Sequence, residues 1–345
     1  MATRGAGRVS PNPMVGCLIV RDGTVLASGW HHRFGLPHAE ADALARLNGK
    51  ARGATLYVNL EPCNHIGKTP PCTEAIIASG VSHVVIAMKD PNAHVRGGGI
   101  RRLRAAGIDV TLGVCEQEAR ELNRAFLHWI RTATPYVTVK LAQSLDAKIA
   151  AHEGTRTQIS GEASQKYVHK LRAEYDAVLI GAGTMRTDHP LLTVRHVRGR
   201  NPVRVIVDTT LRAGYRDTFL SADASTIIYT SKATLKNPKV IALLKRGAGI
   251  VAAPLRGSRI DLDFVLRDLG GRGIASVLVE GGREIATEFL AQRRANELQL
   301  IVAPLFLGDG VEALGPAALK AGSPSSLTTR SLGSDILITA RFSQN

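Results

Sequence analysis

One histidine, two cysteines and a glutamate form the clearest chemical group in the sequence. His38 and Glu40 lie in the segment Pro-His-Ala-Glu, and Cys63 and Cys72 each follow a proline. A catalytic zinc ion takes three protein ligands and leaves its fourth position to water, a count that one His and two Cys thiolates fit. The metal lowers the pKa of that water towards 7 and so makes a hydroxide nucleophile. We therefore predict that His38, Cys63 and Cys72 bind zinc.

The glutamate completes the chemistry, because hydroxide alone cannot expel ammonia from a ring. The leaving amine must be protonated, and a carboxylate beside the metal can carry that proton. Glu40 lies two residues from His38 and is placed for this task. The arrangement follows the logic of zinc deaminases, although eight residues separate Cys63 from Cys72 where the short signature has two. The group predicts hydrolytic deamination with Glu40 as the catalytic proton shuttle.

Two other interpretations of this group stay open from the residues alone, a structural zinc site and a group that binds no metal. A structural site would need a fourth protein ligand, for which Cys17 and His65 are the candidates. Cys17 falls in a predicted strand and Cys115 has no partner motif, so we expect both to be structural. His31 and His32 follow a predicted strand, and we expect them in a loop or in the wall of a substrate site rather than on the metal.

The first part of the chain alternates between strand-like and helix-like patterns. Strands are predicted over 15–20, 24–29, 54–59, 84–88 and 109–112, and helices over 38–48, 72–79, 100–106 and 116–131. This alternation is typical of an α/β layered domain. The segment Thr-Ala-Thr-Pro that ends at Pro135 interrupts the last helix, and we place a domain boundary at 131–136. The predicted domains are 1–133 and 134–345.

The second part of the chain also alternates between strand-like and helix-like patterns, and it contains no internal sequence repeat. Strands are predicted over 136–141, 177–180, 203–207, 226–229, 276–279 and 298–302. Gly281 and Gly282 follow one of these strands and precede a predicted helix over 284–290. Glycine lets a backbone approach a pyrophosphate, and a helix N-terminus favours anions. A Gly-Gly pair is also an ordinary turn, so the residues alone leave both interpretations open.

Composition excludes several classes of protein. The 345 residues include 44% hydrophobic and 21% charged residues, which is an ordinary globular mixture. No apolar run is long enough for a membrane helix, and no apolar stretch typical of a signal peptide follows the N-terminus, so we expect a cytoplasmic protein without membrane contact. The net charge of +15 is spread over both halves, which suits an anionic small substrate or nucleic acid. Aromatic residues are only 4%, which argues against single-stranded nucleic acid.

Several motifs, taken in order, resemble the bifunctional deaminase/reductase family of riboflavin biosynthesis. In the first half they are 10–13 (Ser-Pro-Asn-Pro), 15–17 (Val-Gly-Cys), 37–40 (Pro-His-Ala-Glu), 61–63 (Glu-Pro-Cys) and 67–72 (Gly-Lys-Thr-Pro-Pro-Cys). In the second half they are 140–146 (Lys-Leu-Ala-Gln-Ser-Leu-Asp), 188–195 (Asp-His-Pro-Leu-Leu-Thr-Val-Arg), Asp208 and 279–282 (Val-Glu-Gly-Gly). The resemblance covers nearly the whole chain, and the eight-residue cysteine spacing matches it.

The resemblance implies two consecutive reactions on a phosphorylated pyrimidine. A zinc-dependent step removes the 2-amino group of 2,5-diamino-6-ribosylamino-4(3H)-pyrimidinone 5′-phosphate. NADPH then reduces the ribosyl group of 5-amino-6-(5-phosphoribosylamino)uracil to ribityl. The implied folds are a cytidine deaminase-like α/β/α sandwich and a dihydrofolate reductase-like α/β domain. The implied partner is the small-molecule substrate, without nucleic acid, and the implied assembly is a homo-oligomer, either a dimer or a tetramer.

The resemblance also implies roles for individual residues besides His38, Cys63, Cys72 and Glu40. The implied substrate contacts are Asn12, Arg156, Arg172, Arg195 and Glu280. The two arginines Arg172 and Arg195 suit a phosphate group, which a guanidinium can bind in a bidentate manner. The implied cofactor contacts are Ala142, Gln158, Thr184, Asp188, Thr209, Gly281 and Gly282.

Two residues depart from the family pattern. The family usually has Gly after Ser-Leu-Asp, where this chain has Ala147, and it often has Trp where this chain has Gln158. These positions belong to the expected reductase pocket. They motivate one alternative function, a deaminase with an inactive reductase half. The positive charge motivates a second, a nucleic acid deaminase, which the cysteine spacing and the second domain oppose.

Overall fold

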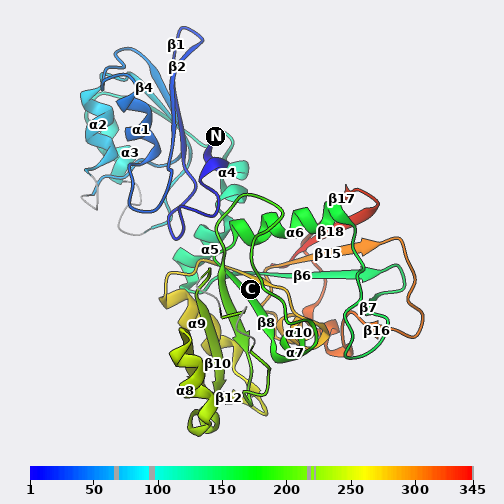
Figure 1. Cartoon of the computed structure of the whole chain (residues 1–345). Helices are drawn as coiled ribbons and strands as arrows, with labels where there is room; N and C mark the ends of the chain where they lie inside the picture. Colours follow the sequence, from blue (N-terminus) through cyan, green and yellow to red (C-terminus); the bar gives the residue numbers. More distant parts are fainter. Residues whose placement is uncertain (66–69, 93–97, 216–218, 221–222, 344–345) are drawn as a thin grey trace. The chain divides into compact units, whose positions relative to one another are not determined.

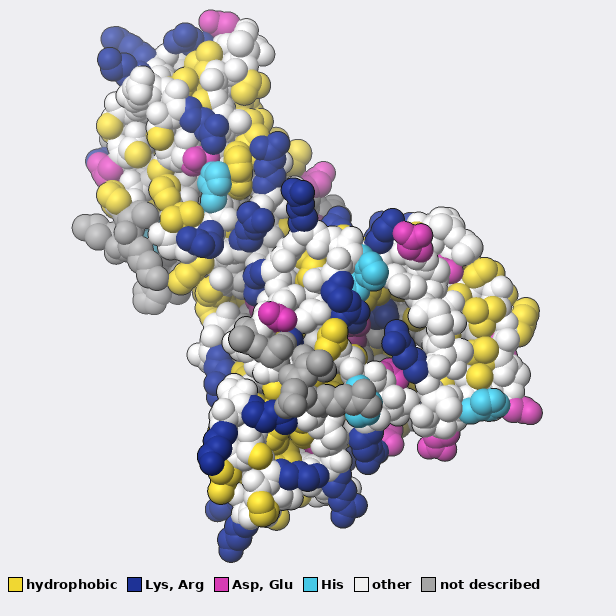
Figure 2. Space-filling view, in the orientation of Figure 1, with side chains coloured by type: hydrophobic (Ala, Val, Ile, Leu, Met, Phe, Trp, Pro, Cys, Tyr) yellow, Lys and Arg dark blue, Asp and Glu magenta, His cyan; other side chains and the backbone are white. Residues whose placement is uncertain are grey.

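The chain forms two compact units, Met1–Ala133 and Thr134–Asn345 (Figure 1). The computed structural model describes residues 1–65, 70–92, 98–215, 219–220 and 223–343. Three residues of the motif before Cys72, namely Gly67, Lys68 and Thr69, lie outside the described residues. Both units combine helices with a central sheet, so the predicted α/β fold class is confirmed. Lys and Arg side chains are scattered over the visible face of both units (Figure 2).

The first unit is built around a five-stranded sheet of order β2-β1-β3-β4-β5. The strands are β1 (Gly16–Arg21), β2 (Thr24–Trp30), β3 (Thr55–Leu60), β4 (His83–Met88) and β5 (Asp109–Leu112). The helices are the 3-10 helix η1 (Ala2–Gly5), α1 (Ala39–Ala45), α2 (Cys72–Ala78), α3 (Gly98–Ala105), α4 (Glu116–Leu122) and α5 (Arg124–Thr132). β1 pairs antiparallel with β2 and β3, while β3, β4 and β5 run parallel. The carboxyl ends of β3 and β4 therefore lie at the same edge of the sheet.

The turn between β1 and β2 follows directly from its sequence. Asp22 and Gly23 both have positive φ, at 50° and 74°. An Asp-Gly pair favours this conformation, whose twist matches that of the flanking antiparallel strands. The strands predicted over 15–20 and 24–29 therefore form a β-hairpin.

The helix predicted over 116–131 is wrong in one respect, because it consists of two helices that meet at Asn123. The backbone of Asn123 leaves the helical region, with φ −103° and ψ 19°. Its buried side chain accepts a hydrogen bond from the Met14 N–H at 2.7 Å and donates one to the Met14 carbonyl at 3.1 Å. The interruption thus fastens the segment before β1, which carries Asn12, to the helical layer.

The second unit contains a nine-stranded sheet of order β11-β10-β9-β8-β14-β6-β15-β18-β17. Its strands are β6 (Tyr136–Ser144), β8 (Ala177–Gly181), β9 (Val203–Val207), β10 (Thr226–Ser231), β11 (Ala248–Ala253), β14 (Ser276–Val279), β15 (Glu297–Ala303), β17 (Ser326–Leu332) and β18 (Asp335–Arg341). Two short pairs are β7 (Lys148–Ala150) with β16 (Val311–Glu312), and β12 (Leu255–Arg256) with β13 (Arg259–Ile260). The helices are α6 (Glu162–Glu174), α7 (Ala182–Asp188), η2 (Lys232–Lys236), α8 (Pro238–Lys245), α9 (Leu262–Gly271), α10 (Arg283–Ala291) and η3 (Pro316–Ala321).

In the order of the sheet, neighbouring strands from β11 through β10, β9, β8, β14 and β6 to β15 are parallel. The last two strands, β18 and β17, pair in antiparallel fashion. The parallel strands other than β11 read as continuous apolar runs because helices cover them, and the sequence predicts them for this reason. The edge strand β11 was not predicted. The C-terminal hairpin was not predicted, since nearly every residue of β17 is exposed and polar residues dominate it. Ligands of such open sheets bind at the carboxyl ends of the parallel strands.

Candidate functional site

The structure brings the three predicted metal ligands together. His38 precedes α1, Cys72 is the first residue of α2, and Cys63 lies in the loop after β3. The Nδ1 atom of His38 is 3.5 Å from the Cys63 sulfur and 3.3 Å from the Cys72 sulfur, and the three ligand atoms all lie within 4.8 Å of one another. Ligand atoms on one tetrahedral zinc ion lie about 3.6 Å apart, given usual bond lengths. Both the donor types and the spacing therefore fit zinc.

The surroundings of Cys63 favour its thiolate form, whereas the hydrogen bond to Cys63 and burial raise the pKa of the Cys72 thiol. The backbone N–H of Cys72 donates to the Cys63 sulfur at 3.3 Å. Hydrogen bonds from the Cys72 thiol, and then from His38, lower the pKa of the Cys63 thiol to about 4. A thiolate is the form that binds a metal. Cys17 is buried in β1 and Cys115 is exposed, and neither belongs to the metal-binding group found among the described residues.

Glu40 lies in the first turn of α1 and is buried, with 3% of its surface exposed. Burial raises the pKa of this carboxyl, since the charged form loses its hydration. The raised pKa brings the group closer to the range in which it can both take up and release a proton.

A cavity of about 270 Å³ opens beside these residues. Its lining includes two of the predicted metal ligands, His38 and Cys63. It also includes the predicted proton shuttle Glu40 and the predicted substrate contact Asn12. Predicted from separate motifs, these side chains thus face one space. The cavity has the character of a small-molecule site, which combines apolar walls with a few polar groups.

The orientation of the Asn12 amide depends on His31. The sequence predicts His31 in a loop or in the wall of a substrate site. The Nδ1 atom of His31 lies 3.0 Å from the Pro37 carbonyl, and its Nε2 atom lies 3.3 Å from the Asn12 amide nitrogen. A carbonyl only accepts, so Nδ1 carries the proton and Nε2 accepts from the amide. Burial lowers the pKa of His31 and keeps this neutral form. The Asn12 amide is therefore held in one orientation.

Two acids at the ends of β3 and β4 complete the cavity wall and were missed by the sequence analysis. Glu61 accepts the backbone N–H groups of Asp90 at 3.3 Å and Ile100 at 3.1 Å. Burial raises the pKa of Asp90 to about 6. The parallel register of β3 and β4 could have indicated this juxtaposition, because Glu61 lies one residue and Asp90 two residues beyond the end of its strand.

In the second unit, the expected cofactor residues gather at the carboxyl ends of neighbouring strands. Thr184 follows β8, Thr209 follows β9, and Gly281 and Gly282 follow β14. The Thr184 hydroxyl accepts the Gly282 N–H at 2.9 Å. Position 281 has no room for a side chain, because a Cβ there would lie 1.6 Å from Cγ2 of Ile285. The predicted helix after the glycines is α10.

A buried ion pair lies at the same edge of the sheet. Arg172 of α6 donates to both carboxylate oxygens of Glu280, at 2.6 and 2.7 Å. Burial lowers the pKa of Lys140 on β6, while the charge of Glu280 opposes that effect. Lys140 belongs to a quoted motif, but sequence reasoning gave it no role. The charge of Glu280 offsets part of the free-energy cost of removing the charges of Arg172 and Lys140 from water.

Two further arginines enlarge this basic group. Arg195 donates from Nη1 to the Thr193 hydroxyl at 3.1 Å. Burial lowers the pKa of Arg195, and the charges of Arg172 and Arg156 lower it further. Arg156 also acts on Asp188, whose pKa is raised by burial and lowered by that charge. The structure thus places Arg156, Arg172, Arg195 and Asp188 near one another.

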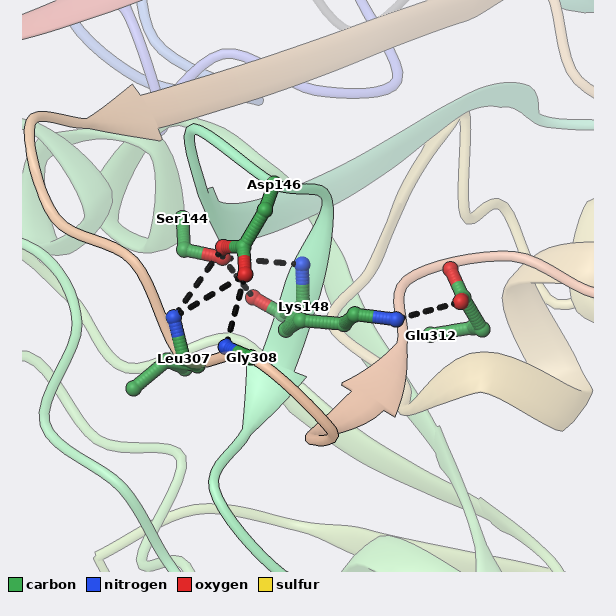
Figure 3. A network of polar contacts seen from close by, with 6 residues as sticks. All are labelled: Ser144, Asp146, Lys148, Leu307, Gly308 and Glu312. Carbon is green, nitrogen blue, oxygen red and sulfur yellow. Dashed lines mark hydrogen bonds and ion pairs between the residues drawn. The ribbon is translucent and has the colours of Figure 1, made fainter.

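The turn between β6 and β7 is tied to the segment before β16 (Figure 3). The Asp146 carboxylate accepts the Ser144 hydroxyl at 2.5 Å and the Gly308 N–H at 2.7 Å. Hydrogen bonding, first from Ser144, lowers the pKa of Asp146. Ala147 has φ 61°, a conformation that glycine adopts more easily, which explains the usual glycine of the family.

The last two expected residues lie apart from those contacts. Ala142 on β6 is paired with Ile301 of β15 and is half-buried. Gln158 is exposed, and its amide donates to the Ser160 carbonyl at 2.7 Å. Within the described part of the chain, neither residue forms a hydrogen bond or an ion pair with Arg172 or Glu280.

Comparison with known proteins assigns both halves. The model of the cytidine and deoxycytidylate deaminase zinc-binding region matches residues 1–88, and the model of the RibD C-terminal domain matches residues 135–337. The chain belongs to the RibD family. The RibD-like sequence therefore contains both a zinc-binding deaminase region and a reductase domain, and the two fold types predicted from the resemblance are confirmed.

Similar proteins cover the full length of this RibD-family chain. The riboflavin biosynthesis protein RibD of Aquifex aeolicus is 40% identical over 98% of this chain and 94% of the relative. The crystal structure of a diaminohydroxyphosphoribosylaminopyrimidine deaminase/5-amino-6-(5-phosphoribosylamino)uracil reductase from Thermotoga maritima has a TM-score of 0.86 and 36% identity, covering 99% of this chain and 95% of that one. Acinetobacter baumannii RibD, form 1, has a TM-score of 0.89 and 34% identity, covering 99% and 96%.

These matches decide between the functions left open by the sequence. Both halves match their own family models, so nothing here supports an inactive reductase. A nucleic acid deaminase would not explain the RibD C-terminal domain. Among the described helices, none is both long and apolar enough to cross a membrane.

Proposed function

We propose that the chain catalyses two consecutive steps of riboflavin biosynthesis. The first is hydrolytic deamination of 2,5-diamino-6-ribosylamino-4(3H)-pyrimidinone 5′-phosphate, assigned to residues 1–133. The second is NADPH-dependent reduction of 5-amino-6-(5-phosphoribosylamino)uracil, assigned to residues 134–345. One observation carries the proposal: the ligand atoms of His38, Cys63 and Cys72 lie within 4.8 Å of one another, beside a cavity that His38, Cys63 and the buried Glu40 line, in a chain that also contains the reductase domain.

In the deaminase half, His38, Cys63 and Cys72 hold a zinc ion, which activates a water molecule when bound. Glu40 would accept a proton from the attacking water and pass it to the leaving amine, which would depart as neutral ammonia. Asn12 hydrogen-bonds the pyrimidine, and the His31 contact keeps its amide in the required orientation.

In the reductase half, NADPH supplies the hydride and the chain supplies orientation and electrostatics. The residues that contact the cofactor are Ala142, Gln158, Thr184, Asp188, Thr209, Gly281 and Gly282. The last two residues admit the pyrophosphate at the N-terminus of α10. Arg156, Arg172, Arg195 and Glu280 contact the substrate, and the arginines neutralise its phosphate.

We also propose that the chain acts as a homo-oligomer, a dimer or a tetramer, in the cytoplasm. The small phosphorylated substrate supports the location, because such metabolites are retained inside cells. Light scattering of the purified chain tests the oligomeric state, and cell fractionation tests the location.

The test of the two-site assignment is a pair of glutamate substitutions. Glu40→Gln retains the shape and the zinc ligands, so we expect normal zinc content, a loss of ammonia release of about 10²–10⁴-fold, and unchanged reduction of the deaminated substrate. Glu74→Gln is the matched control, since Glu74 is exposed on α2 and pairs only with Arg102 among the described residues. Near-normal ammonia release by Glu40→Gln would contradict the assignment.

A further inference from the structure

His169 is a buried histidine beside the basic group of the second unit, and none of the motifs assigns it a role. It lies on α6, one turn before Arg172, and 5% of its surface is exposed. Its ring meets the ring of His196 edge-on, with 4.5 Å between the centroids and 87° between the planes. Burial of a polar ring costs free energy unless its nitrogen atoms are hydrogen-bonded.

One ring nitrogen has a partner that fixes the protonation of His169. The backbone N–H of Arg195 donates to Nδ1 of His169 at 3.0 Å. Because a backbone N–H can only donate, Nδ1 carries the lone pair and the ring proton resides on Nε2. Burial lowers the pKa of His169 to about 4, and the charges of Arg172, Arg195 and His196 act in the same direction against that of Glu280. The ring therefore remains a neutral acceptor near pH 7.

This contact is one of several that fix the segment before His196. Arg172 donates from Nη1 to the Thr193 carbonyl at 3.3 Å. The Val194 N–H donates to the Asn201 side chain at 2.8 Å. The His169 contact is the one that holds the backbone of Arg195 itself. Arg195 is nevertheless an exposed residue, and the charges of Arg172 and Arg156 act on its guanidinium.

We propose that His169 is a positioning residue for the reductase: it anchors the backbone of Arg195 and thereby directs the guanidinium towards the phosphate of the substrate. This inference rests on the proposed function, in which Arg195 binds that phosphate. His169 acts through Arg195 and requires no contact with the substrate. Without the anchor, Arg195 would be repelled by Arg172 and Arg156 and would move away into solvent.

The experiment compares His169→Leu with His169→Asn in steady-state reduction of 5-amino-6-(5-phosphoribosylamino)uracil by NADPH. In asparagine, the amide oxygen branches from Cγ as Nδ1 does in histidine, so it can accept the Arg195 N–H. Leucine fills similar space and cannot. We expect His169→Leu to raise the KM for the substrate about tenfold, equivalent to about 1.4 kcal/mol, with kcat within twofold. We expect His169→Asn to restore the KM to within about threefold of the unchanged chain.

Two further readouts separate positioning from simple packing. A far-UV circular dichroism spectrum and a urea unfolding transition equal to those of the unchanged chain show that the second unit of each variant has folded. Hydrogen exchange of residues 193–196 should be faster in His169→Leu than in His169→Asn or the unchanged chain. Equal impairment of both variants, or a fall in kcat at constant KM, would overturn the role of His169. An unchanged chain that oxidises no NADPH would instead contradict the proposed function.

Discussion

Replacing Gly281 by alanine tests the reasoning about the glycine turn before α10. An ideal Cβ at this position lies 1.6 Å from Cγ2 and 3.2 Å from Cβ of Ile285. Ile285 is β-branched and helical, so its χ1 angle is restricted and the methyl group cannot simply rotate away. Either the turn or the helix must shift. Overpacking of this kind costs about 1–3 kcal/mol, and we expect Gly281→Ala to reduce the free energy of unfolding of the second unit by that amount.

Substitutions of Ile285 identify the clash as the cause. Ile285→Ala removes Cγ2, whereas Ile285→Val keeps both branches at Cβ and serves as the matched control. In the Gly281→Ala background, Ile285→Ala should recover part of the lost stability, and Ile285→Val should not. The resulting double-mutant cycle should give a coupling free energy of about 1–2 kcal/mol.

The assay is urea unfolding followed by two probes that distinguish the units. Both tryptophans, Trp30 and Trp129, lie in the first unit, so their fluorescence should be unaffected. Far-UV circular dichroism reports on both units and should show an earlier transition in Gly281→Ala. The KM for NADPH should also increase. Unfolding of Gly281→Ala that matches the unchanged chain, or equal rescue by the two Ile285 variants, would refute the steric argument.

Three further predictions follow from other residues. Cys72→Ser should lose bound zinc, as measured by metal analysis of the purified chain, and normal zinc content would remove Cys72 from the ligand set. Ala147→Gly should raise the free energy of unfolding by about 0.5–1 kcal/mol, because it relieves a left-handed alanine; a denaturant midpoint at or below that of the unchanged chain would contradict this. Burial lowers the pKa of His128 to about 4 in the folded chain, whereas an unfolded histidine has a pKa of about 6.5. The free energy of unfolding of the first unit should therefore be highest above pH 6.5 and should fall as the pH decreases from 6.5 to 4. His128→Leu should flatten this pH dependence, measured by tryptophan fluorescence in urea, while the exposed His152→Gln should leave it unchanged.

The sequence predicted the metal group because its members carry strong local signals. His38 and Cys72 lie at the start of helices, and Cys63 lies three residues beyond the end of β3, so elements with clear periodicity fix their positions. The parallel strands of the second unit, except the edge strand β11, were predicted for a similar reason, since buried strands read as apolar runs. Fold class and family membership are therefore both confirmed.

The missed features depend on contacts between distant segments. The helix break at Asn123 exists because its side chain holds the backbone of Met14, which lies 109 residues away. The orientation of Asn12 requires His31, and the anchoring of Arg195 requires His169. None of these pairs has a characteristic spacing in sequence. They became visible only when the fold placed the partners side by side.

The most direct test of the central claim is a coupled assay of the purified, zinc-loaded chain with 2,5-diamino-6-ribosylamino-4(3H)-pyrimidinone 5′-phosphate and NADPH. Ammonia release and NADPH oxidation are followed separately. We predict that both signals appear, that ammonia precedes NADPH oxidation, and that their final amounts are equal. Ammonia without NADPH oxidation would contradict the reductase assignment. The absence of both signals from a chain that binds zinc would contradict the proposed function as a whole.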